Sequence, residues 1–312
     1  MIRPISLGFR TTSSSRKSSH RKRKANLRGK KAILTGASTG LGRTLALKLA
    51  EQGVDLALAA RRLEALEDLA QLIRGQGGKA IAVATDVTRS ADCQSFVKQA
   101  VDHLGGVDYL ILNAGVSMWA RLEEISDVSI FERVMATNYL GVVYCIHAAL
   151  PNLIESRGLI VTVSSTQAVL GMPHHTGYTA SKHAVKGFLE ALEFEMDGRI
   201  RLLNVMPGWI RGTDMRANAF VGDGTETGST RRHSSESVSA EECADAMIRA
   251  IKSGQRELFI PAKLRTVPWL KLLAPGWLRR KIRRVVAAQP ESKHRRIRRK
   301  KKLKSRREIT EG

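Results

Sequence analysis

The sequence predicts an α/β fold, in which a doubly wound parallel sheet of Rossmann type carries helices on both faces. Short runs of continuous apolar residues, such as LIVTV at 159–163, alternate with segments whose apolar residues recur at helical spacing. Such runs are typical of strands that are buried on both faces of a parallel sheet. A glycine cluster directly follows the first run, as is common where a strand turns into a helix at a ligand site.

Residues 31–35 form the first expected strand, because this short apolar run ends at the glycine cluster. Leu41, Leu45 and Leu49 then recur at helical spacing and indicate a helix that continues to Glu51. The unit repeats along the chain, with further strands expected at 55–60, 80–85, 108–113, 158–164, 200–206 and 257–260. Further helices are expected at 63–74, 90–104, 130–154, 179–196 and 240–253. Residues 208–239 are rich in Gly, Ser and Thr without periodicity, and we expect them to form a lid over a substrate.

Charge divides the 312 residues into a nearly neutral body and two basic ends. The chain has a net charge of +23, but residues 1–31 contain 11 Lys and Arg and no acid, and residues 262–312 contain 19 against 3 acids. The body at 32–261 therefore has a net charge of −4. We expect a single domain at 29–261, and the other parts are a disordered basic tail at 1–28, a basic amphipathic segment at 262–288 and a disordered basic tail at 289–312. An organellar transit peptide is an alternative interpretation of the acid-free start.

The composition excludes several classes of protein. Three cysteines lie far apart without a CxxC pattern, so we expect neither a disulfide framework nor a metal site, and a reducing compartment such as the cytoplasm fits best. No apolar run reaches the roughly 18 to 20 residues of a membrane-spanning helix, and no signal peptide is evident. His174, His175 and His183 have no metal-like partners in the sequence, and we expect them at the surface or at the rim of a pocket.

The glycine cluster is the first motif that indicates a chemistry. Its residues are Gly36, Ser38, Thr39, Gly40, Leu41 and Gly42. At the start of a helix, missing side chains let the backbone approach a pyrophosphate, whose charge is attracted by the N–H groups and the helix dipole. The cluster therefore indicates a dinucleotide site, and a tight turn without a ligand is the alternative.

The residues after the second expected strand indicate which dinucleotide binds. Sites for NAD usually have an Asp or Glu there that accepts a hydrogen bond from the ribose 2′-hydroxyl group, whereas this chain has Ala60 followed by Arg61 and Arg62. No carboxylate is present to repel a 2′-phosphate, and a guanidinium group can pair with it. We therefore expect NADP(H) in preference to NAD(H). Two alternatives remain open, which are binding of NAD(H) and a purely structural role of both arginines at a helix start.

Tyr178 and Lys182 are four residues apart, so on a helix they share one face. A phenol with a pKa of about 10 is a poor acid or base at neutral pH, but a nearby ammonium group favours the phenolate and lowers that pKa. We expect Lys182 to act on Tyr178 in this way. Tyr178 can then exchange a proton with a hydroxyl or carbonyl group while a hydride moves.

Together these motifs resemble the short-chain dehydrogenase/reductase family over residues 28 to about 260. The matching segments are TGASTGLG (35–42), Asp86-Val87, Asn113-Ala114-Gly115, Asn138, VSS (163–165), YTASK (178–182) and Pro207-Gly208. The resemblance implies an enzyme that transfers a hydride between a nicotinamide cofactor and a secondary alcohol or ketone. Three further segments look most like the branch that contains 11β-hydroxysteroid dehydrogenase and the dehydrogenase/reductase member 7B group, namely ATNYLG, YTASKHAVKGF and LKLLAPGWLRRK. That branch acts on lipid-like or steroid-like molecules and is often membrane-associated, which implies a small apolar substrate.

The resemblance also implies roles for single residues. Tyr178 would be the catalytic acid or base, Lys182 would lower its pKa and bind the nicotinamide ribose, and Ser165 would hold the substrate oxygen. Ser164 competes for the last role, but its spacing to Tyr178 is one residue too long. Asn138 would anchor a water molecule of a proton relay. The other residues expected at the cofactor are Asp86, Val87, Asn113, Ala114, Gly115, Pro207, Gly208, Ile210 and Thr213.

One departure from the family pattern concerns Thr213. The family usually has a Thr five residues after the proline of its Pro-Gly motif, where this chain has Gly212 and only then Thr213. Two explanations are open. Either the turn contains one additional residue, or the hydroxyl contact to the cofactor is weakened.

Bulky apolar residues after the expected strand ends indicate an apolar substrate, with ordinary packing beneath the lid as the alternative. They are Met118, Trp119, Met172, Pro173, Trp209 and Met215. Beyond Pro261, tryptophans and leucines are interleaved with arginines, and four residues recur at helical spacing, namely Leu278, Ile282, Val285 and Val286. We expect this segment to lie on an anionic membrane surface. Packing of its apolar stripe onto the body or onto a second subunit is the alternative.

The final basic run at 293–307 can bind any polyanion, but it lacks interleaved aromatic residues, so specific nucleic-acid recognition is not expected. A second hypothesis for the chain is a cofactor-binding scaffold whose basic tails hold anionic lipid or RNA. The complete set of Asn138, Ser165, Tyr178 and Lys182 favours the enzyme, because a scaffold has no need of it. The resemblance further implies a homodimer or homotetramer formed through the helices that begin near 130 and 179.

Overall fold

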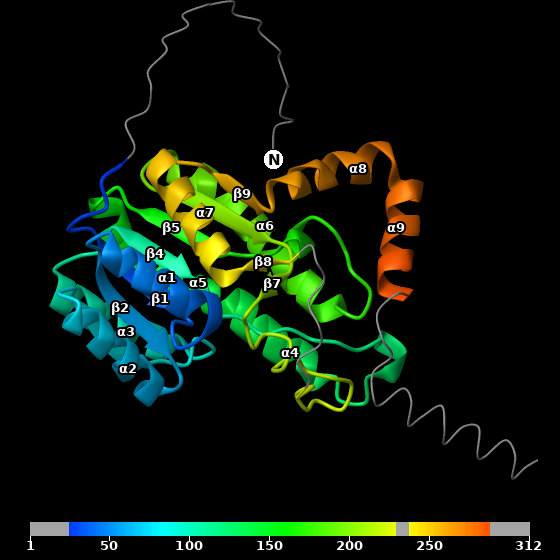
Figure 1. Ribbon diagram of the computed structural model, residues 1–312, viewed down its shortest axis with the longest axis horizontal. Coiled ribbons are helices and arrows are strands. Elements are labelled where there is room, and N and C mark those ends of the chain that lie inside the picture. The colour runs from blue at the N-terminus through cyan, green and yellow to red at the C-terminus, as the bar shows by residue number, and fades with distance from the viewer. Residues whose placement is uncertain (1–24, 229–236, 288–312) are drawn as a thin grey trace, which may run out of the picture.

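The computed structural model describes residues 25–228 and 237–287. Its centre is a seven-stranded sheet in which every pairing is parallel, in the order β3-β2-β1-β4-β5-β6-β9 (Figure 1). The strands are β1 (Lys31–Thr35), β2 (Asp55–Ala60), β3 (Ala80–Ala84), β4 (Tyr109–Leu112), β5 (Leu159–Val163), β6 (Arg201–Pro207) and β9 (Glu257–Ile260). The doubly wound parallel sheet expected from the sequence is confirmed.

Helices cover both faces of this sheet and bury two apolar cores. The helices on one face are α1 (Gly40–Glu51), α2 (Leu63–Gly75) and α7 (Ala240–Ser253). Those on the other face are α3 (Ser90–Leu104), α5 (Gly141–Glu155) and α6 (Thr176–Met196). Leu45 is fully buried in the first core and Phe96 in the second. Because all strands run in the same direction, the loops at their carboxyl ends gather at one edge of the sheet.

A turn of π-helix divides the region that was expected to be one helix over 130–154. α4 (Ser129–Met135) leads into the π turn at Ala136–Leu140, and α5 begins at Gly141. The stretch Ser129–Glu155 is long and apolar enough to cross a membrane by length and composition alone. However, its Cys145 and Ile146 are packed into the core beside α3 and α6, as in a core helix.

The segment expected to form a lid, 208–239, contacts the body in its described parts. β7 (Ile210–Arg211) pairs with β8 (Val238–Ser239), and Phe220 forms a β-bridge with Met118 in the loop after β4. Arg133 of α4 fastens the segment further, because its guanidinium carbon lies 4.3 Å from the centre of the Phe220 ring and its Nη2 donates to the carbonyl oxygen of Gly224 at 3.1 Å. Residues 229–236 lie outside the described residues.

After β9 the chain leaves the sheet and forms α8 (Val267–Leu273) and α9 (Pro275–Ala287), which extend away from it in Figure 1. Lys271 ties α8 to the body, because its Nζ donates to the carbonyl oxygen of Val169 at 3.0 Å. Leu278 of α9 is buried. Several predictions for the ends of the chain lie outside the described residues, namely those for most of the first tail (1–24), for the side chains of Val285 and Val286, and for the final tail with its basic run at 293–307.

Candidate active site

The glycine cluster forms a cradle between β1 and α1. Gly36 and Gly40 have φ angles of +66° and +54°, which are left-handed conformations that favour glycine. A Cβ atom at Gly42 would lie only 2.1 Å from the carbonyl oxygen of Gly36, so no larger residue fits. The side chain of Thr39 does not cap α1, and the first turn contains no acidic residue. The N–H groups at the start of α1 are therefore suited to bind an anion.

Asn113 and Thr35 join this cradle to the loop after β4. Asn113 Nδ2 donates to the carbonyl oxygen of Gly36 at 2.9 Å. Thr35 Oγ1 accepts hydrogen bonds from the backbone N–H groups of Asn113 and Ala114 at 3.1 and 3.2 Å. A Cβ atom at Gly36 would meet the Cα of Ala114 at 2.8 Å, so the loops after β1 and β4 pack directly against each other.

Arg61 and the Asp86-Val87 pair lie at the same edge of the sheet. Arg61 is exposed directly after β2, and no acidic residue stands in the expected ribose position. Asp86 follows β3, and its Oδ1 accepts hydrogen bonds from the backbone N–H and the hydroxyl of Thr88 at 3.0 and 2.8 Å. Val87 is buried. Because β3, β2 and β1 are neighbours, these residues continue the row that begins at the glycine cradle.

Ser165, Tyr178 and Lys182 come together between β5 and α6. Ser165 Oγ accepts a hydrogen bond from the backbone N–H of Gln167 at 3.1 Å, and its hydroxyl lies close enough to the phenol of Tyr178 to lower its pKa. Lys182 Nζ donates to the carbonyl oxygen of Val163 at 3.2 Å and lies 5.5 Å from the centre of the Tyr178 ring. All three side chains are buried. The structure therefore places together the three residues that the sequence assigned to proton transfer.

Burial dominates the ionisation of this group. It raises the pKa of Tyr178 to about 12, against the hydrogen bond with Ser165, which lowers it. It lowers the pKa of Lys182 to about 8. The pKa of Tyr178 is therefore raised overall, which is the opposite of the lowering expected from the sequence, because desolvation of the phenol is the largest effect. The ammonium group of Lys182 is bonded to the carbonyl of Val163. At neutral pH the phenol of Tyr178 is protonated and is suited to act as an acid.

Asn138 lies in the π turn, and its side-chain amide is fully buried. Its Oδ1 accepts a hydrogen bond from the backbone N–H of Val116 at 2.8 Å, while its Nδ2 donates to the Val116 carbonyl and to Ser181 Oγ at 2.9 and 3.0 Å. A Cβ atom at Gly115 would lie 3.2 Å from Asn138 Oδ1 and 3.8 Å from Lys182 Nζ. Asn138 thus fixes the loop after β4 beside the lysine. Both amide hydrogens of Asn138 donate to these partners. A water molecule anchored by Asn138, as predicted from the sequence, would therefore bind to the backbone of Asn138.

Thr213 lies against the glycine cradle, at the end of a turn that contains Gly212. Gly212 has a φ of +76°, a left-handed conformation that favours glycine. A Cβ atom at Gly40 would lie 3.3 Å from Cβ and Cγ2 of Thr213. Thr213 therefore reaches the glycine cradle although it is one residue late in the sequence. The two other residues expected at the cofactor in this segment are Gly208 and Ile210.

His175 is buried beside Tyr178, so the expectation that it lies at the surface or rim is wrong. Its ring centre is 4.8 Å from that of Trp119 and 6.0 Å from those of Tyr178 and Trp209. Burial lowers the pKa of His175 to about 4, so its ring is neutral at pH 7. Its Nδ1 faces the carbonyl oxygen of Pro173 at 3.2 Å, which leaves Nε2 as a hydrogen-bond acceptor. Nothing in the sequence distinguished this histidine from its neighbours.

Other expected residues occupy the same region. Met118 is fully buried, and its sulfur accepts the backbone N–H of Gly177 at 3.1 Å. The hydroxyl of Ser164 is buried without a hydrogen-bond partner among the described residues, so Ser165 is the serine that contacts Tyr178. His183 is exposed.

The glycine cradle fits the pyrophosphate of a dinucleotide. The glycine cradle would be filled by Cβ atoms at Gly36 or Gly42, and the start of α1 offers N–H groups at the same point. Across residues 25–228 and 237–287, no three His, Cys, Asp or Glu side chains are grouped so as to hold a metal ion.

Comparisons with known proteins agree with this geometry. The sequence profile of the family described as short chain dehydrogenase matches residues 30–223. The 11-beta-hydroxysteroid dehydrogenase 1A of Arabidopsis thaliana is 34% identical over 256 residues, which are 80% of this chain and 73% of that protein. The 11-beta-hydroxysteroid dehydrogenase A of Arachis hypogaea is 35% identical over 259 residues, which are 81% of this chain and 74% of that protein.

Two solved structures have a similar fold. A short chain dehydrogenase/reductase from Burkholderia phymatum, in complex with NAD, has a TM-score of 0.67 and 27% identity, and the match covers 77% of this chain and 93% of that one. An alcohol dehydrogenase from the archaeon Thermococcus sibiricus, complexed with 5-hydroxy-NADP, has a TM-score of 0.64 and 27% identity, covering 74% and 95%.

Proposed function

The chain belongs to the short-chain dehydrogenase family, and on this premise we propose that it is an NADP(H)-dependent enzyme that interconverts a secondary alcohol and a ketone on an apolar substrate. Membership of the family makes the protein an oxidoreductase that acts on CH–OH groups. The observation that carries the finer proposal is the buried contact of Ser165, Tyr178 and Lys182 beside the glycine cradle.

In the proposed reaction a bound nicotinamide cofactor supplies or accepts the hydride. The hydroxyl of Ser165 holds the substrate oxygen next to the phenol of Tyr178, since the Ser165 hydroxyl is close enough to that phenol to lower its pKa. In the reductive direction, Tyr178 gives its proton to the carbonyl oxygen as the hydride reaches the carbonyl carbon. Its raised pKa of about 12 keeps that proton in place at neutral pH. Lys182 then stabilises the phenolate, because a positive charge 5.5 Å from the ring favours the negative form.

The preference for NADP(H) is supported by the end of β2. Arg61 is exposed there, and Ala60 occupies the position at which an acidic residue would repel a 2′-phosphate. A guanidinium group binds phosphate by paired, charge-assisted hydrogen bonds.

The proposal of an apolar substrate is supported by the side chains that surround Tyr178. The ring of His175 lies 4.8 Å from that of Trp119 and 6.0 Å from that of Trp209, and Met118 belongs to the same apolar cluster as Tyr178. At neutral pH His175 carries no charge, so this wall favours an apolar group over an ion.

We further propose that the enzyme lies in the cytoplasm against an anionic membrane surface. The described part of the C-terminal segment, 262–287, contains basic residues and no acid, and its Trp269, Leu272 and Leu273 are strongly exposed. Copies of the chain would associate as a homodimer or homotetramer through α4, α5 and α6. The exposed Phe194 on α6 supports this arrangement.

The proposed function is tested by titrating wild type and variants with NADPH and NADH and by measuring carbonyl reduction on a panel of ketones. We expect Tyr178→Phe to bind NADPH normally but to lose most of its turnover, about 100-fold or more. Arg61→Ala is expected to weaken NADPH binding about tenfold or more and to leave NADH binding unchanged, because only NADPH carries the 2′-phosphate. Arg256→Ala, which removes an exposed arginine on another part of the surface, is the control. Full turnover in Tyr178→Phe would refute the catalytic assignment, and an unchanged cofactor preference in Arg61→Ala would refute the assignment of NADP(H).

A further inference from the structure

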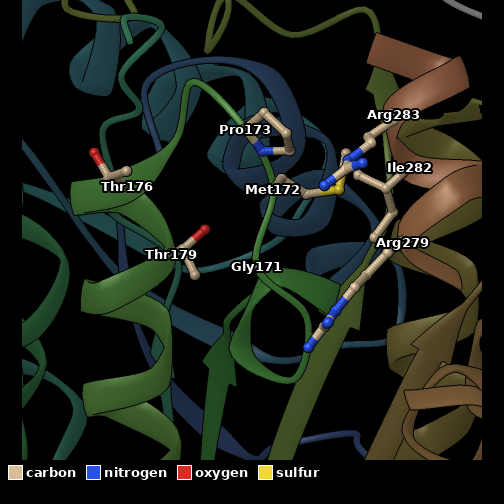
Figure 2. Close-up of a pocket in the computed structure, with 8 residues that line it drawn as sticks. All are labelled: Gly171, Met172, Pro173, Thr176, Thr179, Arg279, Ile282 and Arg283. Atoms are coloured by element: carbon tan, nitrogen blue, oxygen red, sulfur yellow. The ribbon is translucent and has the colours of Figure 1, made fainter. Parts of the chain in front are cut away.

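A groove separates α9 from the loop between β5 and α6 (Figure 2). Its volume is about 460 Å³, which lies within the roughly 300 to 1,000 Å³ of small-molecule sites. Figure 2 shows side chains of α9 pointing across it toward the loop and the first turns of α6. The lining residues are Gly171, Met172, Pro173, Thr176, Thr179, Arg279, Ile282 and Arg283.

The groove combines an apolar wall with two positive charges. Arg279 and Arg283 are four residues apart on α9 and flank Ile282, so all three project toward the same groove. Met172 and Pro173 provide apolar surface on the opposite side. The lining contains no carboxylate, and within the described residues neither arginine forms an ion pair. Such a site favours a molecule that has both an anionic group and an apolar chain.

The surface next to the groove is of the kind that contacts a lipid bilayer. Trp269, Leu272 and Leu273 of α8 are 65%, 72% and 75% exposed, and Trp277 at the start of α9 is 46% exposed. Bulky apolar side chains next to arginines and lysines are typical of segments that lie in the interface of an anionic membrane. Trp277 and Arg279 project from different faces of α9, because they are two residues apart. The same helix forms one wall of the groove, so the groove lies next to a bilayer that receives Trp277.

We propose that this groove binds one anionic phospholipid, whose phosphate is held by Arg279 and Arg283. Its acyl chain lies along the apolar side chains of the lining. The proposal rests on the membrane association proposed above, but it is narrower, since it assigns one stoichiometric site in addition to a diffuse attraction between basic residues and the surface.

Monomeric dihexanoylphosphatidic acid, used below its critical micelle concentration, tests the groove without a membrane. The lipid is titrated calorimetrically into the full-length protein, into the double variant R279Q/R283Q and into R280Q/R284Q. Arg280 and Arg284 stand on the same helix and carry the same charge, but they do not line the groove, so the second variant is a matched control. We expect R279Q/R283Q to bind at least about tenfold more weakly than the control, because only it removes charge-assisted hydrogen bonds to the phosphate.

Inorganic phosphate provides the second arm of the experiment. It lacks the acyl chain, so we expect wild type to bind it at least about tenfold more weakly than the lipid. Equal losses of lipid affinity in R279Q/R283Q and R280Q/R284Q would indicate a diffuse attraction between the basic residues and the lipid, and would overturn the proposal. Equal affinity for phosphate and lipid would also overturn it, since the site would then recognise phosphate alone. The absence of saturable lipid binding by the wild type would likewise overturn the proposal.

A photoactivatable analogue of the same lipid locates the binding site independently of the variants. With a diazirine on its acyl chain, we expect covalent labelling of the segment that contains Met172 and of the segment that contains Ile282. Unlabelled lipid should compete for both. Labelling confined to other segments would contradict the proposed groove, even if membrane vesicles still bind to the basic ends of the chain.

Discussion

Lys182 carries a buried positive charge, and its burial lowers the stability of the folded protein. Replacing Lys182 with Met removes this charge. Burial lowers the pKa of Lys182 from 10.5 to about 8, so the folded state holds the proton less tightly than the unfolded state. At pH 7 this difference corresponds to a penalty of about 3 kcal/mol. Methionine has a similar length but cannot donate to the carbonyl of Val163, and the loss of that hydrogen bond costs about 1 kcal/mol. We therefore expect Lys182→Met to be about 2 kcal/mol more stable than wild type at pH 7, in the absence of cofactor, and inactive as an enzyme.

The sign of the pH dependence makes this prediction specific. Between pH 8 and 10.5 the unfolded state binds more protons than the folded state, so the stability of wild type should rise with pH relative to the variant. The assay is urea unfolding at several values from pH 6 to 10.5. Lys186→Met is the control, because Lys186 lies one turn further along α6 and pairs with Glu190 at the surface. A Lys182→Met protein less stable than wild type at pH 7, or a difference that stays constant up to pH 10.5, would refute the reasoning.

Two further predictions concern the cradle and the segment over the site. Gly42→Ala places a Cβ atom 2.1 Å from the carbonyl oxygen of Gly36; we expect a loss of about 1 to 3 kcal/mol in stability and little NADPH binding, measured by unfolding and by fluorescence titration. Gly187→Ala in α6 is the control, because the added Cβ has no neighbour within 4 Å outside the local helix backbone, and it should leave stability unchanged or slightly higher. An equal change in stability for Gly42→Ala and Gly187→Ala would contradict the proposed clash with Gly36. Arg133→Ala removes the contacts that hold Phe220 and its segment; we expect faster proteolysis there and a KM raised severalfold with kcat nearly unchanged, whereas an unchanged KM would show that this segment does not cover the substrate.

Most strands and helices could be predicted because each is indicated by the pattern of residues within that element. Strands such as 55–60 and 257–260 match the structure in both bounds, since apolar runs bounded by turns define a buried strand. The π turn at Ala136–Leu140 could not be predicted, because the apolar pattern continues through it. Within this turn the side-chain amide of Asn138 is bonded through its oxygen and its nitrogen to the backbone of Val116 in the loop after β4, a tertiary contact that the apolar pattern does not indicate.

The candidate site likewise contains features that the sequence predicts and features that depend on tertiary packing. The spacing of Tyr178 and Lys182 predicted that they share a helix face, and they do. The direction of the pKa shift of Tyr178 was wrong because it depends on burial, which results from the packing of several elements and is not encoded in a spacing of four residues. His175 was missed for the same reason, since only the fold brings the rings of Trp119 and Trp209 around it.

The loop between β5 and α6 connects the catalytic group to the proposed lipid groove. It contains Ser165, whose hydroxyl lies beside the phenol of Tyr178, and it ends with His175, whose ring lies 6.0 Å from that of Tyr178. Between them, Met172 and Pro173 line the groove. The carbonyl of Pro173 also faces His175 Nδ1 at 3.2 Å, so a ligand that moves this carbonyl also changes the orientation of a side chain next to the reacting atoms.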